Sequence, residues 1–264
     1  MDLLTVNHLE KAFGGVTAIS NLSFRVPKGI VYSVIGPNGA GKTTLFNMLC
    51  GFYLPDNGTI EFQPDTGETI LLHSTPTFKI AESGISRTFQ NLQIFFNMTA
   101  LENVMVGCHL QSNCGFVEAL FRTRKVRTEE KRVHQQALEA LAFCKLEDLA
   151  NETADSLPYG HLKRLEIARA LASKPQLLMM DEPAAGLNDT ETREMSLLIR
   201  RICNAGTSVL LVEHNMDLVM KTSDQILVIN FGGLLAEGTP EEIQRDSAVI
   251  HAYLGGDMKE AANV

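Results

Sequence analysis

Apolar and polar positions alternate along the N-terminal part of the chain. Residues 3–9 and 16–26 alternate in this way on either side of Gly14-Gly15, a pattern that predicts two antiparallel strands joined by a glycine turn. Shorter runs around residues 59–63 and 69–72 follow a Pro-Asp-Asn-Gly turn and predict two further strands. Together these segments predict a small antiparallel sheet.

Farther along, the apolar residues form short unbroken runs. Residues 30–35, 177–180 and 208–212 are of this kind, which is typical of strands buried on both faces of a sheet. Segments of helical periodicity lie between them, including one in which apolar residues between 195 and 202 fall on a single face. Strands that alternate with helices on this scale predict an α/β fold, with a parallel sheet covered on both sides.

The remaining elements follow from the same patterns. Thr99 and Glu102 have the spacing of a helix capping box, and Asp189 or Thr190 is expected to cap the later amphipathic helix. The charged run at 122–132 predicts a solvated helix face. Further strands are expected at 85–89, 225–230 and 233–237, and further helices at 101–106, about 115–149, 162–172, 216–222 and after Pro240.

A glycine-rich turn follows the strand at 30–35 and matches the phosphate-binding pattern Gly-x4-Gly-Lys-Thr. Its glycines allow backbone N–H groups to point at a phosphate at the positive end of the next helix. We expect Lys42 to reach the β- and γ-phosphates of a nucleotide and the Thr43 hydroxyl to bind Mg²⁺. A turn without a ligand is the alternative, which the flanking strand and helix disfavour. The loop consists of Gly36, Pro37, Asn38, Gly39, Ala40, Gly41, Lys42, Thr43 and Thr44.

Two adjacent carboxylates, Asp181 and Glu182, end the buried run at 177–180. Proteins with a phosphate loop hold Mg²⁺ through an acidic residue at the end of a neighbouring strand. We therefore expect Asp181 to bind the ion through water and Glu182 to polarise an attacking water. Paired carboxylates at the end of a buried strand have few structural explanations, because burying charge is costly.

Three further residues are candidate site residues only because of their positions along the chain. Phe13 ends the first predicted strand, where it is either a core aromatic or a ring that stacks on a base. Gln90 follows the strand at 85–89, and His214 follows the strand at 208–212. A lone amide or imidazole is weak evidence, but both lie where the ends of parallel strands meet.

Composition narrows the choice of function and compartment. The chain has 264 residues and a formal net charge of −8, which argues against broad nucleic-acid binding. Its five cysteines, at 50, 108, 114, 144 and 203, are scattered and odd in number, which indicates reduced thiols in a cytosolic protein. The sequence has neither a signal-peptide pattern nor an apolar stretch of about 18 residues, so any membrane role is expected to be peripheral.

The set of motifs, in this order, resembles the ATP-binding subunits of ABC transporters from about residue 3 to 254. Within that family, the runs Arg87-Thr-Phe-Gln-Asn91 and Ile250-His-Ala-Tyr-Leu-Gly255 are similar to the branched-chain (hydrophobic) amino acid uptake group, and to the longer of its two ATPase subunits. The motifs are Phe13, Gly36–Thr44, Gln90, Leu157–His161 with Lys163–Leu171, Met180–Pro183, Ala185–Asn188 and His214.

This resemblance implies a P-loop NTPase (RecA-like) fold in one ABC ATPase domain, residues 1–264. Its parallel core, with an antiparallel β-subdomain, would take up about residues 1–90 and 175–254. A helical subdomain with the signature segment would take up about 91–174, and 255–264 would be a tail.

The resemblance also implies a role for each site residue. Phe13 would stack on adenine, and the loop Gly36–Thr44 would wrap the triphosphate of ATP. Gln90 would sense Mg²⁺ or the attacking water, Glu182 would be the general base, and His214 would contact the γ-phosphate. Three signature residues, Tyr159, Gly160 and His161, would act on the ATP held by an opposite subunit. The implied ligands of Mg²⁺ are Thr43, Gln90 and Asp181.

Three positions depart from the family pattern. Pro158 stands where serine is usual and offers neither a hydroxyl nor an N–H, so one γ-phosphate contact is lost. His161 replaces the usual glutamine, and Asn188 replaces an aspartate. We therefore expect the composite site that uses this signature segment to be weaker than the one built on this chain's own loop.

The expected partners are membrane permease subunits, a second ATPase subunit or another copy in a head-to-tail dimer, and indirectly a solute-binding protein, at the cytoplasmic face of the inner membrane. No nucleic-acid partner is expected. The alternatives are a lipopolysaccharide-export-type ATPase, an ABC protein acting on ribosomes or DNA, and a nucleotide switch that hydrolyses slowly. The transported solute is not encoded in this chain.

Overall fold

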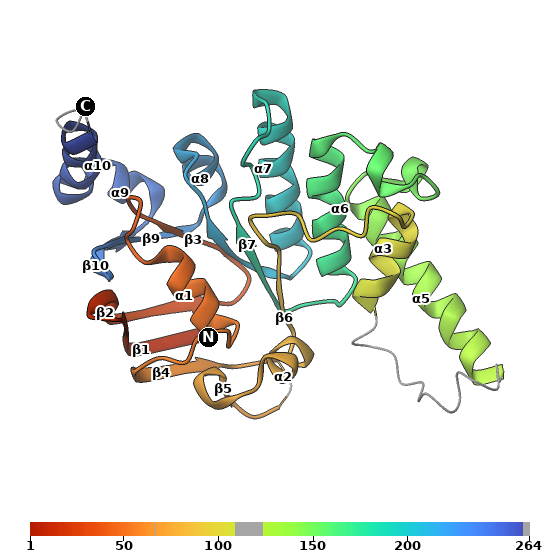
Figure 1. The fold of residues 1–264 in the computed structure, drawn as a ribbon, viewed down its shortest axis with the longest axis horizontal. Helices are drawn as coiled ribbons and strands as arrows, with labels where there is room; N and C mark the ends of the chain where they lie inside the picture. The colour runs from red at the N-terminus through yellow and green to blue at the C-terminus, as the bar shows by residue number, and fades with distance from the viewer. Residues whose placement is uncertain (66, 109–123, 261–264) are drawn as a thin grey trace.

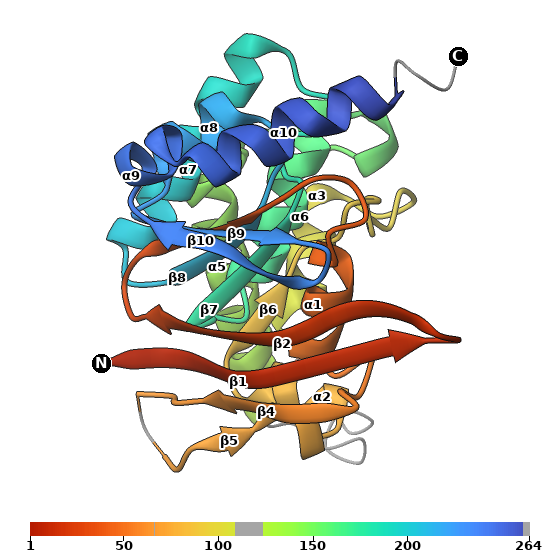
Figure 2. The same ribbon diagram turned by 90° about the vertical axis from the view of Figure 1, so that its left-hand side faces the viewer.

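A computed structural model describes residues 1–65, 67–108 and 124–260 of the chain (Figure 1). Two sheets and the helices around them make up this part of the protein, with the ribbon of the first two strands lying below the larger sheet (Figure 2). The expected helical segment at 115–123 and Cys114 lie outside the described residues.

The smaller sheet is antiparallel, has the strand order β2-β1-β4-β5, and confirms the predicted N-terminal strands. A hairpin closes where Phe13 pairs with Val16, across Gly14 and Gly15, which have φ angles of 52° and 90°. Such positive φ angles favour glycine, because other residues meet steric strain there. The strands are β1 (Asp2–Phe13), β2 (Val16–Pro27), β4 (Asn57–Phe62) and β5 (Ile70–Leu71).

The larger sheet has the order β10-β9-β3-β8-β7-β6. The pairs from β9 to β6 are parallel, and β10 joins the edge in the antiparallel direction. Its strands are β3 (Val31–Ile35), β6 (Ile85–Arg87), β7 (Leu177–Asp181), β8 (Ser208–Val212), β9 (Gln225–Asn230) and β10 (Gly233–Gly238). This is the predicted parallel core, and it brings the ends of β3, β6, β7 and β8 to one edge of the sheet.

Helices cover the larger sheet, and α3, α5 and α6 gather at the end of the molecule far from α10 (Figure 1). A capping box of Thr99 and Glu102 begins α3, as predicted. The helices are α1 (Lys42–Leu49), α2 (Thr77–Glu82), α3 (Ala100–Gly107), α5 (Arg124–Phe143), α6 (Tyr159–Leu171), α7 (Asp189–Asn204), α8 (Met216–Thr222), α9 (Pro240–Arg245) and α10 (Ser247–Glu260).

Both faces of the central strands are buried, as their unbroken apolar runs predicted. In β7, Leu178 and Met180 join the core under α3, α5, α6 and α7, whereas Leu177 and Met179 join the core shared with α1 and the smaller sheet. Successive residues of a strand point to opposite faces, so one short strand ties the two cores together.

Several predicted element ends were wrong: α6 begins at Tyr159 instead of 162, and α5 ends at Phe143 instead of about 149. Asn188, not Asp189 or Thr190, caps α7: its side chain accepts hydrogen bonds from the N–H groups of Thr190 and Glu191, both at 3.0 Å. Three consecutive residues are able to cap, and the extended backbone at Asn188 decides between them. Strand β6 ends at Arg87 instead of 89, although the Thr88 N–H still donates to the Met179 carbonyl at 2.9 Å.

Three observations on the residues that the structure describes bear on the predictions from composition and charge. Among those residues, no helix combines the length and the apolar character needed to cross a membrane. Cys50, Cys108, Cys144 and Cys203 are buried and free. The described part of the charged run, residues 128–132, lies on an exposed or half-exposed face of α5.

Candidate functional site

The phosphate loop runs from the end of β3 to the start of α1, as its sequence pattern predicts. A Cβ at Gly36 would lie 2.1 Å from the Ile229 carbonyl oxygen, and one at Gly41 would lie 2.4 Å from that of Ala18. Neither backbone group can move away cheaply, so glycine is required at both positions. The close approach of Ala18 also places the start of β2 beside the loop.

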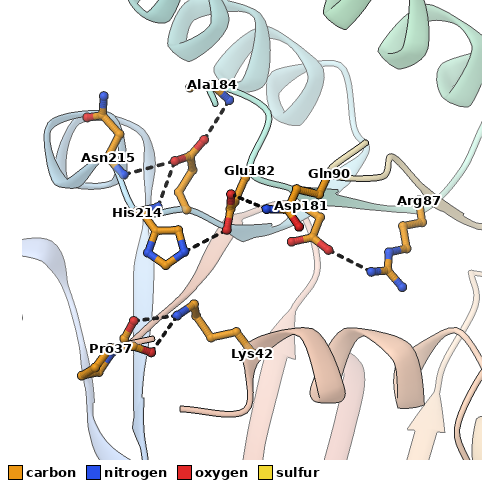
Figure 3. A network of polar contacts seen from close by, with 11 residues as sticks. Pro37, Lys42, Arg87, Gln90, Asp181, Glu182, Ala184, His214 and Asn215 are labelled. Atoms are coloured by element: carbon orange, nitrogen blue, oxygen red, sulfur yellow. Dashed lines mark hydrogen bonds and ion pairs between the residues drawn. The ribbon is translucent and has the colours of Figure 1, made fainter. Parts of the chain in front are cut away.

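Lys42 is buried, and its ammonium group is held by the loop itself. Its Nζ donates to the carbonyl oxygens of Gly36 at 2.7 Å and Pro37 at 3.0 Å (Figure 3). Burial lowers the pKa of Lys42, while the charges of Glu182 and Asp181 act in the opposite direction. A buried cation with only carbonyl partners has a strong electrostatic preference for an anion such as a phosphate.

The two strand-end carboxylates have different surroundings. Asp181, the last residue of β7, is buried and accepts a hydrogen bond at Oδ2 from Arg87 at 2.8 Å. The same guanidinium donates to Oδ1 of Asn47 in α1 at 2.7 Å. Glu182 follows with a φ angle of 51°, a strained value for a residue with a side chain. This turn directs the Glu182 carboxylate away from β7 and toward the ends of neighbouring strands.

Three loops meet at the Glu182 carboxylate (Figure 3). Gln90, beyond β6, donates from Nε2 to Oε2 of Glu182 at 3.1 Å. Nε2 of His214, beyond β8, lies 2.8 Å from Oε1. Strands β6, β7 and β8 are neighbours, so the sheet order explains the meeting. The structure thus brings together the three residues that were predicted separately.

Sequence reasoning missed the supporting residues Arg87 and Glu213. Glu213 is buried, and its carboxylate accepts from the backbone N–H groups of Ala184 at 2.8 Å, His214 at 3.0 Å and Asn215 at 3.1 Å. It therefore ties the loop after β8 to the loop after Glu182. The available signal was a second carboxylate at a buried strand end, directly before His214.

Phe13 lies at the end of β1, and its side chain is 43% exposed. The ring packs edge-on against Tyr53 with centroids 5.3 Å apart, and the Lys11 ammonium lies 5.4 Å from its centroid. The core-aromatic interpretation is wrong, because a core ring would be buried. A ring that is supported on its edge and open on part of its surface is suited to stacking.

The signature segment lies at the start of α6, away from the carboxylate cluster. No hydrogen bond or ion pair of the described residues joins positions 157–161 to the phosphate loop. Pro158 is the N-cap and supplies no side-chain hydrogen bond. Tyr159 is 44% exposed, and a Cβ at Gly186 would lie 3.0 Å from its ring, so the two residues are in close contact. Tyr159 is thus exposed at this turn, whereas Gly160 is buried and His161 is half-buried.

The donor set agrees with a Mg²⁺ ion that is held jointly by protein and phosphates. Asp181 offers a carboxylate and Thr43 an exposed hydroxyl, and both are hard oxygen ligands. The described parts of the chain contain no group of three or more His, Cys, Asp or Glu residues arranged to hold a metal. Mg²⁺ commonly takes one or two protein ligands and completes its shell with water and phosphate oxygens.

Comparison with known proteins shows which family the chain resembles. A family model described as ABC transporter matches residues 19–185, and one described as branched-chain amino acid ATP-binding cassette transporter matches residues 234–259. The high-affinity branched-chain amino acid transport ATP-binding protein BraF of Pseudomonas aeruginosa is 46% identical over 254 residues, 96% of this chain and 98% of the relative. LivG of Escherichia coli, described in the same terms, is 44% identical over 254 residues, with the same coverage.

Solved structures agree with the sequence comparisons. A nucleotide-free ATP-binding cassette from an ABC transporter has a TM-score of 0.81 and 32% identity, covering 96% of this chain and 99% of that one. A cassette in its ADP conformation has a TM-score of 0.82 and 32% identity, covering 97% and 99%. Because sequence and fold match along nearly the whole length, the chain belongs to the ABC transporter family and is one of its nucleotide-binding ATPases.

Proposed function

We propose that this chain hydrolyses ATP to energise the import of branched-chain amino acids, or related small amides, from the cytoplasmic face of the cell membrane. The relatives that match it over nearly its whole length are named as branched-chain amino acid transport proteins. The family model at its C-terminal segment carries the same description. The main observation in support of ATP hydrolysis is that Gln90 and His214 both contact the Glu182 carboxylate.

In the proposed reaction, Glu182 accepts a proton from the attacking water. The new bond forms between the water oxygen and the γ-phosphorus as the bond to the bridging oxygen breaks, releasing ADP and phosphate. Gln90 and His214 hold the two oxygens of the Glu182 carboxylate, and Lys42 exchanges its carbonyl partners for phosphate oxygens. Mg²⁺, held by Asp181 and Thr43, would supply positive charge beside the β- and γ-phosphates.

The working form in this proposal is a head-to-tail dimer, either with a second, shorter ATPase chain or with another copy. Among the described residues, no hydrogen bond or ion pair joins residues 157–161 to the phosphate loop of the same chain, which supports a role on the nucleotide of the opposite subunit. The first turn of α6 presents backbone N–H groups, and a helix N-terminus favours an anion. Pro158 removes one donor from this surface, which supports two unequal composite sites.

A groove beside Gln90 supports membrane permease subunits as partners. Its volume is about 570 Å³, and it lies between α2 and β6 on one side and α3 and α6 on the other. Its lining includes the apolar side chains of Phe52, Phe89, Phe95 and Val106, three of which are at least 43% exposed. A permease segment seated there would touch Phe89, the residue directly before Gln90.

The test is uptake of labelled leucine into vesicles that contain the purified transporter with this subunit. We expect uptake that requires ATP and stops in a Glu182→Gln complex, with a Lys28→Met complex as the control because Lys28 pairs with Asp65 on the surface. Uptake by the Glu182→Gln complex at the normal rate would refute the hydrolytic assignment. ATP hydrolysis without uptake of leucine or of other aliphatic amino acids would refute the assigned solute class.

A further inference from the structure

Two charged side chains of α6 are almost completely buried although neither belongs to the hydrolytic cluster. Lys163 is 2% exposed and Glu166 is 3% exposed. They are three positions apart, so they lie on one face of the helix. Burying a charged group is costly unless it makes specific hydrogen bonds, so the hydrogen-bond partners of these two side chains explain why they are buried.

Those partners include backbone groups of two consecutive residues in one segment, and Glu166 also has a backbone hydrogen bond with Gln93. Oε1 of Glu166 accepts from the Phe89 N–H at 3.1 Å, and Nζ of Lys163 donates to the Gln90 carbonyl oxygen at 3.2 Å. Burial raises the pKa of the Glu166 carboxyl, and the bond from the Phe89 amide opposes this rise. Each of the two charged side chains thus holds a backbone group of this segment.

Among the described residues, no backbone hydrogen bond joins the segment to the larger sheet beyond Thr88. The Thr88 N–H donates to Met179 in β7, and after that residue the chain leaves the larger sheet. Two residues later, the Gln90 side chain reaches Glu182. The main chain of Phe89 and Gln90 is therefore held by β7 on one side and by α6 on the other.

We propose that Lys163 and Glu166 are positioning residues that fix Gln90 relative to α6, so that the two respond together to a bound nucleotide. We name this pair, with its bonds to Phe89 and Gln90, the α6 clasp. The first turn of α6 carries residues 159–161, so contact between that turn and the partner's nucleotide sets Gln90 against Glu182 in the same chain. Each site's hydrolysis thereby depends on the nucleotide across the interface. The inference rests on the proposed head-to-tail dimer and on the proposed role of Gln90.

The test uses the intact transporter with Lys163→Met or Glu166→Leu, which remove the hydrogen-bonding atoms. Losing one hydrogen bond to a charged group, about 1.5–3 kcal/mol, predicts a roughly 10- to 150-fold fall in kcat, with KM for ATP changed less than about twofold. The Hill coefficient of hydrolysis against ATP concentration should fall toward one. Lys163→Arg and Glu166→Gln keep a donor and an acceptor, and should retain most of the kcat and the Hill coefficient.

Arg164→Met is the matched control, because Arg164 lies on the same helix and pairs with Glu194 of α7 instead. A merely structural role predicts a loss of folded protein, measured by thermal unfolding, with the Hill coefficient of the folded fraction unchanged. If Lys163→Met does not fold, Glu166→Leu decides alone.

Gln90→Ala separates the clasp from the function on which it rests. If Gln90→Ala lowers kcat while Lys163→Met and Glu166→Leu behave like Arg164→Met, the clasp is refuted and the proposed function stands. If Gln90→Ala itself leaves kcat unchanged, the proposed role of Gln90 fails, and the clasp fails with it.

Discussion

The two halves of the nucleotide machinery are built differently within this one chain. The strand-end half is held by hydrogen bonds and ion pairs, within the phosphate loop at Lys42 and between separate loops at Asp181, Glu182 and His214. The signature half, at the start of α6, has a proline N-cap without a side-chain bond and a tyrosine that is 44% exposed. The strand-end half is thus held by contacts within the chain, whereas the signature half has an exposed ring and an N-cap without a side-chain hydrogen bond.

The difference shows where preorganisation is needed. Groups that act on a reacting bond gain from being fixed before the substrate arrives, since no reorganisation is then required. In the proposed dimer, the signature half would meet only the nucleotide of the opposite subunit. It therefore has no ligand within its own chain around which it could be fixed. Substitutions in the first half should therefore act on chemistry and binding in this subunit, and substitutions in the second should act on the opposite site.

The largest effect is expected from Glu182→Gln, which removes the general base but keeps the shape of the side chain. The rate of hydrolysis should fall by about 10²- to 10⁴-fold, the usual contribution of general base catalysis. ATP affinity should remain, so size-exclusion chromatography with ATP should reveal a trapped closed dimer. A variant with normal turnover would show that the base lies elsewhere.

Lys42→Ala should follow, with a loss of nucleotide affinity. The ammonium group makes charge-assisted hydrogen bonds, each contributing about 1.5–3 kcal/mol, so ATP should bind roughly 100-fold more weakly. Titration with a fluorescent ATP analogue measures this directly, and a thermal unfolding curve checks that the protein is folded. Unchanged affinity would mean that the phosphates do not reach Lys42.

Phe13→Ala should have a smaller effect, on recognition of the base. Stacking on an aromatic ring contributes about 1–3 kcal/mol per base, which predicts a roughly tenfold higher KM for ATP with little change in kcat. Phe13→Tyr keeps the ring and serves as the matched control. If tripolyphosphate hydrolysis falls in parallel with ATP hydrolysis, the ring does not act through adenine.

The smallest effect is a gain in turnover rate from Pro158→Ser, which tests the signature half. Serine restores an N–H and a hydroxyl at the start of α6, and one added hydrogen bond of about 1 kcal/mol predicts an up to fivefold faster turnover at the opposite site. The opposite site is isolated by combining the change with Glu182→Gln, which silences this chain's own hydrolysis. An unchanged rate in that double variant would remove Pro158 as the cause of any asymmetry between the sites.

The sequence predicted those parts of the fold and site that depend on neighbouring residues. The loop before Lys42 and the carboxylates after the run at 177–180 are local patterns, and the sheet order then brings Gln90 and His214 to Glu182. The pairing of Arg87 with Asp181 joins residues 94 positions apart, and no local pattern reveals it. Burial of Lys163 and Glu166 was equally hidden, since charged residues on a helix normally face solvent.

The order of strands in the larger sheet has a consequence for synthesis of the protein on the ribosome. Strand β3, which ends in the phosphate loop, pairs with β8 and β9, and both are made long after it. The loop therefore leaves the ribosome early, but its strand has no neighbours in the sheet until most of the chain has been translated. Contacts between such distant segments form slowly and leave apolar strands exposed for longer. A nascent chain thus cannot complete the sheet edge that carries the site until β8 and β9 have emerged, and its apolar strands are most exposed in the interval before then.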